Sequence, residues 1–189
     1  MSNIKKFLTS FLIILFIPIK LSALIEVDIT RGNLNPLPLA VSPLSIDEKS
    51  RKGFEQKLKK ENIGLEISAI VENNLKVSGL FNPLSKDAFL QAPDIANLKP
   101  RFEDWNLIKA QALITGKVSL IDEKLRVEFR LWDVLAGKEM MALAFTTVPN
   151  NWRRVGHIIS DKVYERLTGE KGYFDTRIIY VAEEGPKTK

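Results

Sequence analysis

Few residues in this chain combine the types and spacing that catalysis needs. His157 is the only histidine, so a single imidazole would have to act without the several ligands that a zinc site usually requires. Asp161 and Glu165 lie four residues apart in a segment with helical periodicity, where like charges repel modestly. Asp133 stands at the end of an expected strand, and no serine or carboxylate has the spacing of a catalytic triad. We therefore expect a structural or interface role for His157 and solvated or capping roles for the acids.

The remaining composition points away from cofactor and thiol chemistry. The glycines of the second half of the chain are scattered singly, without the clustering of a phosphate-binding loop. The sequence contains no cysteine, which excludes disulfides and lipid attachment to a cysteine. We predict no catalytic, metal-binding or cofactor-binding residues, and we predict that the chain is not an enzyme.

The first 23 residues have the features of a cleavable signal peptide. Lys5 and Lys6 precede an apolar run over 7–17, and Ala23 supplies the small residue that a signal peptidase needs. A membrane helix needs about 20 apolar residues, so the run is short for a span, and an uncleaved anchor is the alternative. Cleavage removes three lysines and no acid, which lowers the net charge from +5 to +2 and gives little reason to expect nucleic-acid binding. The 189 − 23 = 166 residues that remain fit one compact domain.

Two short strands are expected at the start of the mature chain. Ile25, Val27 and Ile29 alternate with polar residues, which is the period of a strand with one apolar face. Such a terminal strand either pairs with its own sheet or remains free to join another. A second strand is expected over 37–41, where Pro38 lacks the N–H donor of a sheet ladder and therefore predicts an edge position.

A change of composition separates these strands from the first expected helix. Residues 45–60 are rich in lysine and poor in apolar residues, which favours a mobile loop or a loosely packed helix with a solvated face. From 63 to 75, apolar residues repeat at helical spacing, and Gly79 stands where a left-handed C-terminal cap belongs.

The middle of the chain contains less regular patterns. Residues 80–84 are expected to be extended, with large side chains in the core, and residues 92–100 to form a connecting loop. Phe102 and Trp105 predict a short helix, because aromatic rings of this size contribute most when they are buried.

The clearest pattern predicts an antiparallel meander of three strands. Apolar residues alternate over 112–120 and over 125–131, with Asp122 and Glu123 as a tight turn between them, and a third strand follows over 141–147. The expected fold class is α/β (α+β). It has a mixed sheet of about five strands, in which the three-strand meander packs against two main helices.

A last helix and an unpaired strand follow the meander. The helix is expected to begin at Asn150 or Asn151, to place one apolar stripe against the core, and to end at Gly169. Residues 177–181 then have strand character without a hairpin partner. We expect Arg177, within that strand, to pair with an acid at a domain junction.

Motifs spread over the whole mature chain resemble one known family. They are Pro38-Leu39-Ala40-Val41, Ser78-Gly79-Leu80-Phe81, Trp105, Ile114-Thr115-Gly116-Lys117-Val118, Phe129-Arg130-Leu131-Trp132-Asp133, and the run 152–181 with Ser160-Asp161, Tyr164-Glu165, Leu167-Thr168-Gly169 and Thr176-Arg177-Ile178. This set resembles the amino-terminal domain of the TolB family, the periplasmic component of the Tol-Pal system of Gram-negative bacteria.

The resemblance implies a domain organisation and one partner. Residues 24–175 correspond to the α/β amino-terminal domain, and residues 176–189 to a linker or first strand of a six-bladed propeller that is absent here. In the family the propeller binds the lipoprotein Pal, so Pal binding is doubtful for this chain. The family's mature N-terminus engages the inner-membrane-linked protein TolA, and Arg177 and Tyr180 fall at the domain junction. By position, the TolA-binding residues correspond to Leu24, Ile25, Glu26, Val27, Asp28 and Ile29.

We therefore expect a periplasmic protein-interaction module of the Tol-Pal system, which supports outer-membrane integrity and envelope constriction during cell division. Its expected mechanism is addition of the strand 25–29 to a sheet of TolA. The alternative is a stand-alone periplasmic domain that binds a small molecule or cell-wall fragment in a cleft, which requires converging polar groups. An enzyme is the third class, and it would require that His157→Ala remove any activity found.

Overall fold

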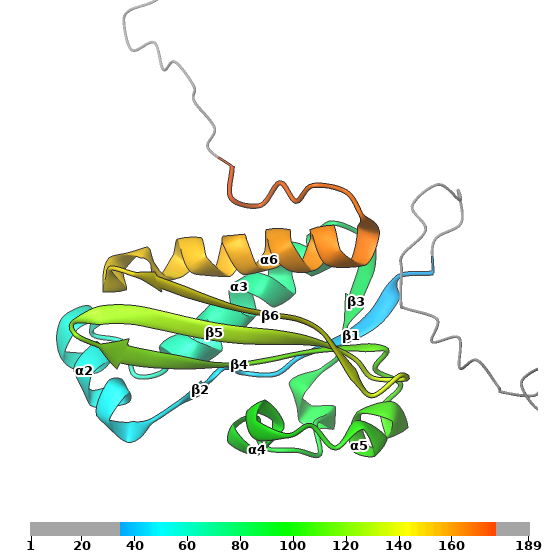
Figure 1. Cartoon of the computed structure of the whole chain (residues 1–189), viewed down its shortest axis with the longest axis horizontal. Coiled ribbons are helices and arrows are strands. Elements are labelled where there is room, and N and C mark those ends of the chain that lie inside the picture. The colour runs from blue at the N-terminus through cyan, green and yellow to red at the C-terminus, as the bar shows by residue number, and fades with distance from the viewer. Residues whose placement is uncertain (1–34, 177–189) are drawn as a thin grey trace, which may run out of the picture.

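The structure is a computed structural model, and it describes residues 35–176 (Figure 1). The expected signal peptide and the expected strands over 25–29 and 177–181 lie outside the described residues. In chain order the elements are β1 (Leu37–Val41), β2 (Ser45–Ile46), α2 (Glu48–Leu58), α3 (Ile63–Val77), β3 (Phe81–Pro83), the 3-10 helix η1 (Lys86–Ala88), α4 (Pro93–Leu98), α5 (Phe102–Leu107), β4 (Ala112–Ile121), β5 (Lys124–Asp133), β6 (Lys138–Thr147), the 3-10 helix η2 (Pro149–Asn151) and α6 (Trp152–Thr168).

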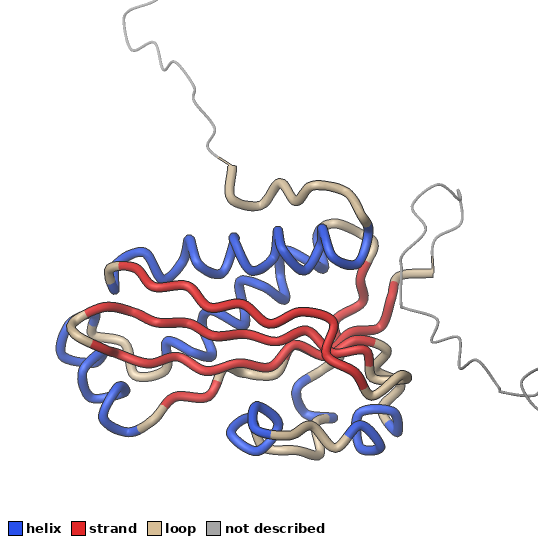
Figure 2. Tube along the Cα trace, viewed as in Figure 1, coloured by secondary structure: helices blue, strands red, loops and turns tan. Residues whose placement is uncertain are grey.

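Within residues 35–176, six strands form one mixed sheet. Its order is β3-β1-β4-β5-β6, and β2 also pairs with β4. β1 is parallel to both β3 and β4, whereas β4, β5 and β6 form the antiparallel meander that the alternation predicted. Figure 2 shows the strands between two groups of helices, with α3 and α6 on one side and α4 and α5 on the other. The expected α+β class, with a meander packed against two main helices, is confirmed.

The prediction that Pro38 marks a sheet edge is wrong, because β1 lies between β3 and β4. The N–H of Leu37 donates to Leu80 on the β3 side, whereas the carbonyl of Pro38 accepts from Gln111 on the β4 side. The ladder with β4 begins one residue later, where Leu39 faces Ala112. Pro38 therefore lacks its N–H at a point just before the ladder with β4 begins. A proline is tolerated in this interior strand for that reason.

The main core lies between the sheet and helices α3 and α6. Alternate residues of β4 and β5 face these helices and are buried, whereas the residues between them are half-buried or exposed at most positions. The expected ends of the two helices are confirmed, since Gly79 and Gly169 have φ angles of 75° and 76°. Asn151 occupies the N-cap of α6, but its side chain donates to Thr147 Oγ1 at 3.0 Å and makes no capping bond.

The lysine-rich segment forms the helix α2, which is firmly attached to the sheet. Asp47 caps its first turn, because its Oδ1 accepts from the N–H of Ser50 at 2.8 Å. Ser50 Oγ in turn accepts from the N–H of Leu120 in β4 at 3.0 Å. Phe54 is fully buried in the main core. The expectation of a mobile loop or loose packing is therefore wrong, because Ser50 and Phe54 together fix the helix.

The expected loop over 92–100 contains the short helix α4, which begins at Pro93 in the first helical position. This helix and α5 cover the second face of the sheet, where Trp105 is buried as predicted. The side chain of Gln91 joins them, since its Oε1 accepts from Trp105 Nε1 and from the N–H of Arg101, both at 3.0 Å. Its Nε2 donates to the carbonyl of Lys99 at 3.1 Å.

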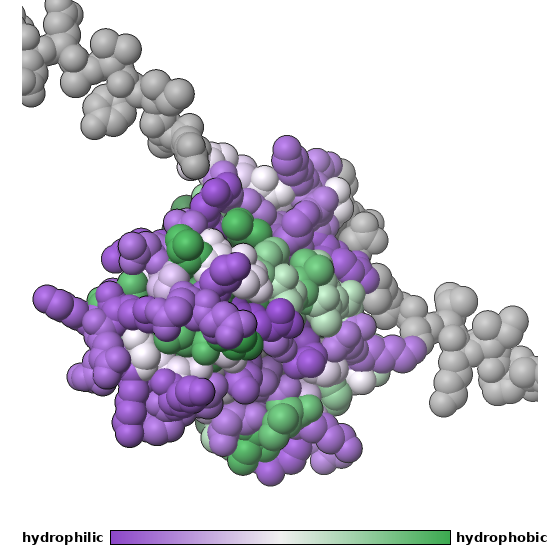
Figure 3. Space-filling model, turned by 60° about the vertical axis from the view of Figure 1, so that its left-hand side comes forward, coloured by the Kyte–Doolittle hydropathy of each residue, from purple (hydrophilic) through white to green (hydrophobic). Residues whose placement is uncertain are grey.

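The last residues of α4 and α5 remain at the surface. Leu98 and Leu107 are 84% and 74% exposed. Figure 3 shows apolar surface at the lower end of the molecule, at the level where Figure 1 places these two helices. The two helices thus bury Trp105 but leave their final leucines open to solvent.

Candidate protein-interaction site

The predicted site residues flank the part of the chain that the structure describes. Residues 24–29 and the pair Arg177 and Tyr180 lie outside it. The structure does define what stands next to each group: β1 follows the first group, and the segment 170–176 precedes the second. We call residues 170–176 the C-terminal strap, because they run back along α6 (Figure 2).

Asp161 fastens the C-terminal strap to α6. Its Oδ1 accepts from the N–H of Phe174 at 2.6 Å, and its Oδ2 accepts from the N–H of Asp175 at 3.1 Å. Gly172 packs directly on this residue, since a Cβ at Gly172 would lie 2.4 Å from the Asp161 Cα. A solvated or capping role was expected for Asp161, whereas its carboxylate binds N–H groups of the C-terminal strap and none of its own helix.

A second contact fixes the far end of the C-terminal strap. The guanidinium of Arg154 donates from Nε and Nη2 to the carboxylate of Asp175, with each donor–acceptor distance at 3.1 Å. A two-pronged arginine–carboxylate pair constrains orientation as well as distance. The backbone direction is therefore set one residue before Thr176, which is the last residue described.

Aromatic rings fill the space beneath the C-terminal strap. Tyr164 on α6 contacts Phe81 of β3, Tyr173 and Phe174 edge-on, with centroid distances of 5.5 to 6.1 Å. Burial is the main cause that raises the pKa of Tyr164, and the nearby Tyr173 and Glu170 add to it. The cluster links the strap to the edge strand β3, which pairs with the start of β1 through Phe81 and Leu37.

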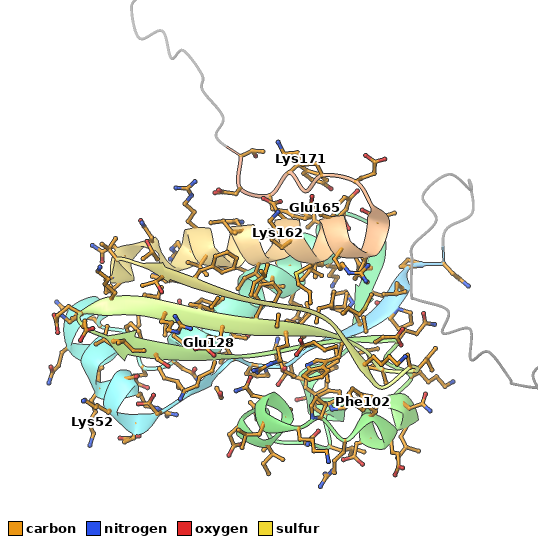
Figure 4. All side chains as sticks on the ribbon, in the orientation of Figure 1. Lys52, Phe102, Glu128, Lys162, Glu165 and Lys171 are labelled. Carbon is orange, nitrogen blue, oxygen red and sulfur yellow. The ribbon has the colours of Figure 1, made fainter. Side chains whose placement is uncertain are left out.

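Exposed ion pairs lie on the outer surface of α6. Lys162 donates to Glu165 at 2.8 Å, and this hydrogen bond lowers the pKa of the Glu165 carboxyl, with a further contribution from Lys171. Figure 4 shows these three residues together above α6. Glu165 is thus solvated and paired with lysine, and it does not act with Asp161 as an acid pair.

His157 lies between α3 and α6. Its Nδ1 is 2.9 Å from Asn74 Nδ2, and the same amide donates to Ser160 Oγ at 3.0 Å. Since the amide nitrogen can only donate, Nδ1 is the acceptor in this contact. The imidazole therefore joins two helices, and within residues 35–176 no group of three or more His, Asp or Glu side chains is arranged to hold a metal ion.

An open hollow of about 300 Å³ lies where β2, α2 and α4 meet. It is the kind of place that the small-molecule alternative would use, and Arg51 and Asn62 line it. Both side chains already interact with a helix. Arg51 lies 3.9 Å from Glu48 within α2, and Asn62 caps α3 by accepting from the N–H of Leu65. The hollow thus has few uncommitted polar groups. Its lining residues are Pro43, Leu44, Ser45, Ile46, Arg51, Asn62, Pro93 and Asp94.

Sequence reasoning identified the residues of the C-terminal strap only as a family motif and missed their mutual contacts. One local signal was available, because Gly172 precedes two aromatic residues and Asp175 directly after the end of a helix. Their partners Asp161 and Arg154 are 13 to 21 positions away. Local periodicity carries no information on such pairs.

None of the helices between residues 35 and 176 has the length and apolar content needed to cross a bilayer.

These features define an α+β domain in which a mixed sheet has helices on both faces and the C-terminal strap is fastened to the last helix. Residues 25–140 match the family model described as the TolB amino-terminal domain, and the chain belongs to this family, as its motifs predicted. It is 81% identical over 179 residues to the Tol-Pal system protein TolB of Pelagibacter ubique (strain HTCC1062), which covers 95% of this chain and 40% of that protein. The chain thus spans about 40% of the length of this relative.

A solved structure supports the same fold. The crystal structure of TolB from Acinetobacter baumannii matches with a TM-score of 0.58 and 21% sequence identity. The match covers 79% of this chain and 32% of that one. The fold of the domain is therefore shared despite low sequence identity.

Proposed function

We propose that this chain is a non-enzymatic, periplasmic interaction module of the Tol-Pal system. In this proposal the signal peptide 1–23 directs export, and the module contributes to outer-membrane integrity and to envelope constriction during division. The observation that carries the proposal is the 81% identity to a Tol-Pal system protein over nearly the whole chain.

The proposed mechanism is strand addition by the segment 24–29. Its backbone groups pair with an exposed sheet edge of a TolA-like protein, while Ile25, Val27 and Ile29 occupy alternate pockets. The fold supports this use of the segment because β1 begins only at Leu37, whose N–H already donates to Leu80 at 2.9 Å. Removing residues 24–29 therefore breaks none of the strand pairs that the structure describes.

The junction residues Arg177 and Tyr180 are proposed to contact whatever follows the domain in longer relatives. Asp175 is already occupied by Arg154, so Arg177 would pair with an acid elsewhere. A double-mutant cycle that finds no coupling of Arg177 to any carboxylate contradicts this part of the proposal. Pal binding is not proposed for this chain.

The test compares the chain that starts at Leu24 with a form that lacks residues 24–29. Binding to the periplasmic part of TolA is measured by calorimetry, and stability is measured by thermal unfolding. We expect binding to disappear while the unfolding transition is nearly unchanged. Binding of equal strength by both forms contradicts the proposal.

A matched control keeps the composition of the segment but inverts its alternation. Exchanging Ile25 with Glu26 and Val27 with Asp28 moves two of the three apolar side chains to the opposite face of the strand and leaves Ile29 in place. We expect this variant to bind weakly. A parallel assay with peptidoglycan fragments tests the small-molecule alternative, and saturable binding there would favour that class.

A further inference from the structure

Strand β6 forms one edge of the sheet, and within the described residues it pairs with β5 alone. An edge strand leaves a row of backbone N–H and C=O groups without ladder partners, which is a template for another strand. The opposite edge, β3, has three residues and ends at Pro83, which lacks a donor. β6 has ten residues, and residues 140–147 contain neither a proline nor a charged side chain.

The edge of β6 is accessible. Ala142, Leu143 and Ala144 are all exposed. Near the start of the strand, Arg166 of α6 reaches the carbonyl of Met140 at 3.4 Å, so the helix protects that end. The part from residue 141 onward is the stretch open to pairing.

We propose that this edge binds an extended segment of a partner protein that is apolar on one face and acidic on the other. The apolar requirement comes from the face of β6 that lies toward α6. Leu143 stands there at 38% exposure, and Phe145 stacks on Phe129 of β5 with a centroid distance of 6.1 Å. Apolar side chains of an added strand extend this row and cover Leu143.

The acidic requirement comes from the opposite face of the meander. Ala142 and Ala144 are too short to shield β5, whose Arg126 and Arg130 side chains are 39% and 36% exposed. Arg126 pairs with Glu128, and Arg130 pairs with Glu139 and also donates to the carbonyl of Asn97 at 3.5 Å. The strand residues of this face include four cations and two acids, and Asp47 lies 4.0 Å from Lys117, so acidic side chains of an added strand meet one more cation than acids. The charged residues are Lys117, Lys124, Arg126, Arg130, Glu128 and Glu139.

The chain's own segment 24–29 alternates in a similar way but fits this edge less well. From the start of β1, the position beyond β6 is four strand spacings away, or about 19 Å. The seven residues 30–36 span at most about 25 Å when fully extended, so the tether would have little slack. A second copy of β6 offers no acid within residues 140–147. Compared with residues 24–29 and a second copy of β6, a segment of another protein is the favoured occupant, and this inference does not depend on the proposed function of residues 24–29.

The probe is a fluorescent seven-residue peptide in which valine alternates with glutamate, and a version with lysine in place of glutamate is its control. Binding to the chain from Leu24 is measured by fluorescence anisotropy, and amide hydrogen exchange locates it. We expect the glutamate peptide to bind at least tenfold more tightly than the lysine peptide and to protect amides within 140–147. Equal binding of the two peptides, or protection elsewhere only, overturns the proposal.

Two variants test the edge strand β6 and the positive charge of β5 separately. Leu143→Lys places a charge on the edge and should weaken binding at least tenfold, whereas the matched control Val77→Lys, at a 74% exposed position on α3, should leave it unchanged. Arg126→Glu with Arg130→Glu keeps the edge and should reverse the preference between the two peptides. Unchanged binding in both tests contradicts the proposal.

Two further outcomes identify a different occupant and also overturn the proposal. Binding that becomes at least tenfold tighter when residues 24–29 are deleted means that the chain's own segment occupies the edge. Protection of residues 140–147 that rises with protein concentration, without peptide, means that a second copy occupies it.

Discussion

The side chain of Asp161 holds the backbone of Phe174, with Oδ1 2.6 Å from the amide nitrogen. Since the same carboxylate also accepts from Asp175, one residue fixes the direction in which the chain leaves the domain. Asp161→Ala should lower the free energy of unfolding by about 1–2 kcal/mol, because two hydrogen bonds to a charged group are lost. Amide exchange at Phe174 and Asp175 should rise most. The control Glu165→Ala, one turn further on, removes an exposed pair with Lys162 and a weaker attraction to Lys171, and it should change the stability much less than Asp161→Ala does.

Asn74 joins α3 to α6 through His157 and Ser160. Asn74→Ala should cost about 1–3 kcal/mol, because a half-buried imidazole nitrogen loses its donor. Chemical denaturation measures the loss. The neighbouring Asn73 is exposed, and Asn73→Ala should remain within about 0.5 kcal/mol of the parent. A loss of equal size in both variants would contradict the contact as its cause, and helix propensity cannot explain a loss because alanine is the better helix former.

Gln91 is buried and satisfies the indole N–H of Trp105. Gln91→Leu keeps the approximate volume but leaves that N–H without an acceptor, so we expect a loss of about 2–3 kcal/mol. The change should also raise amide exchange in α4 and α5. The adjacent Leu90 is 59% exposed, and Leu90→Ala should have little effect on either measurement.

Asp47 makes the free energy of unfolding of the domain depend on pH in the acid range. Its hydrogen bond from the N–H of Ser50 is the main cause that lowers the pKa of this carboxyl below its ordinary value of 3.8. The contribution of the cap is therefore fully present well above pH 3.8 and is lost as the pH falls through the lowered folded value. Asp47→Ala should cost about 1 kcal/mol at pH 7, and the difference from the parent should shrink toward pH 2.

Unfolding free energies measured from pH 7 to pH 2 check this dependence. Glu61→Gln serves as the control, because Glu61 is exposed between α2 and α3. A difference between parent and Asp47→Ala that stays constant over the whole range would contradict the capping role.

Local sequence pattern predicted the structure correctly where it depends on residues that are close together in the chain. The alternation over 112–120 and 125–131 predicted the meander, because residues two apart share one face of a strand. The end of α3 was predicted from Gly79, since its left-handed conformation is a property of that residue. The charge pattern of 45–60 was less informative, because burial of the single residue Phe54 outweighed many exposed lysines.

The candidate site was only partly accessible to sequence reasoning. The family motifs identified the amino-terminal domain, and Asp161 was expected to be solvated or to cap backbone groups. Its actual partners, the N–H groups of Phe174 and Asp175, follow only when the chain turns back at Gly169 and passes along α6. The predicted strand 24–29 remains a prediction.

By itself, the sequence determined the family, the meander and the two main helices, because side-chain periodicity and glycine caps act over a few residues. Only the tertiary structure decided that Pro38 lies in an interior strand and that β6 is left at an edge. Strand order depends on pairs such as Leu37 with Phe81 and Leu39 with Ala112, which are far apart in the chain. Their free energy comes from joint burial in one core, and no local pattern records which distant strand will supply it.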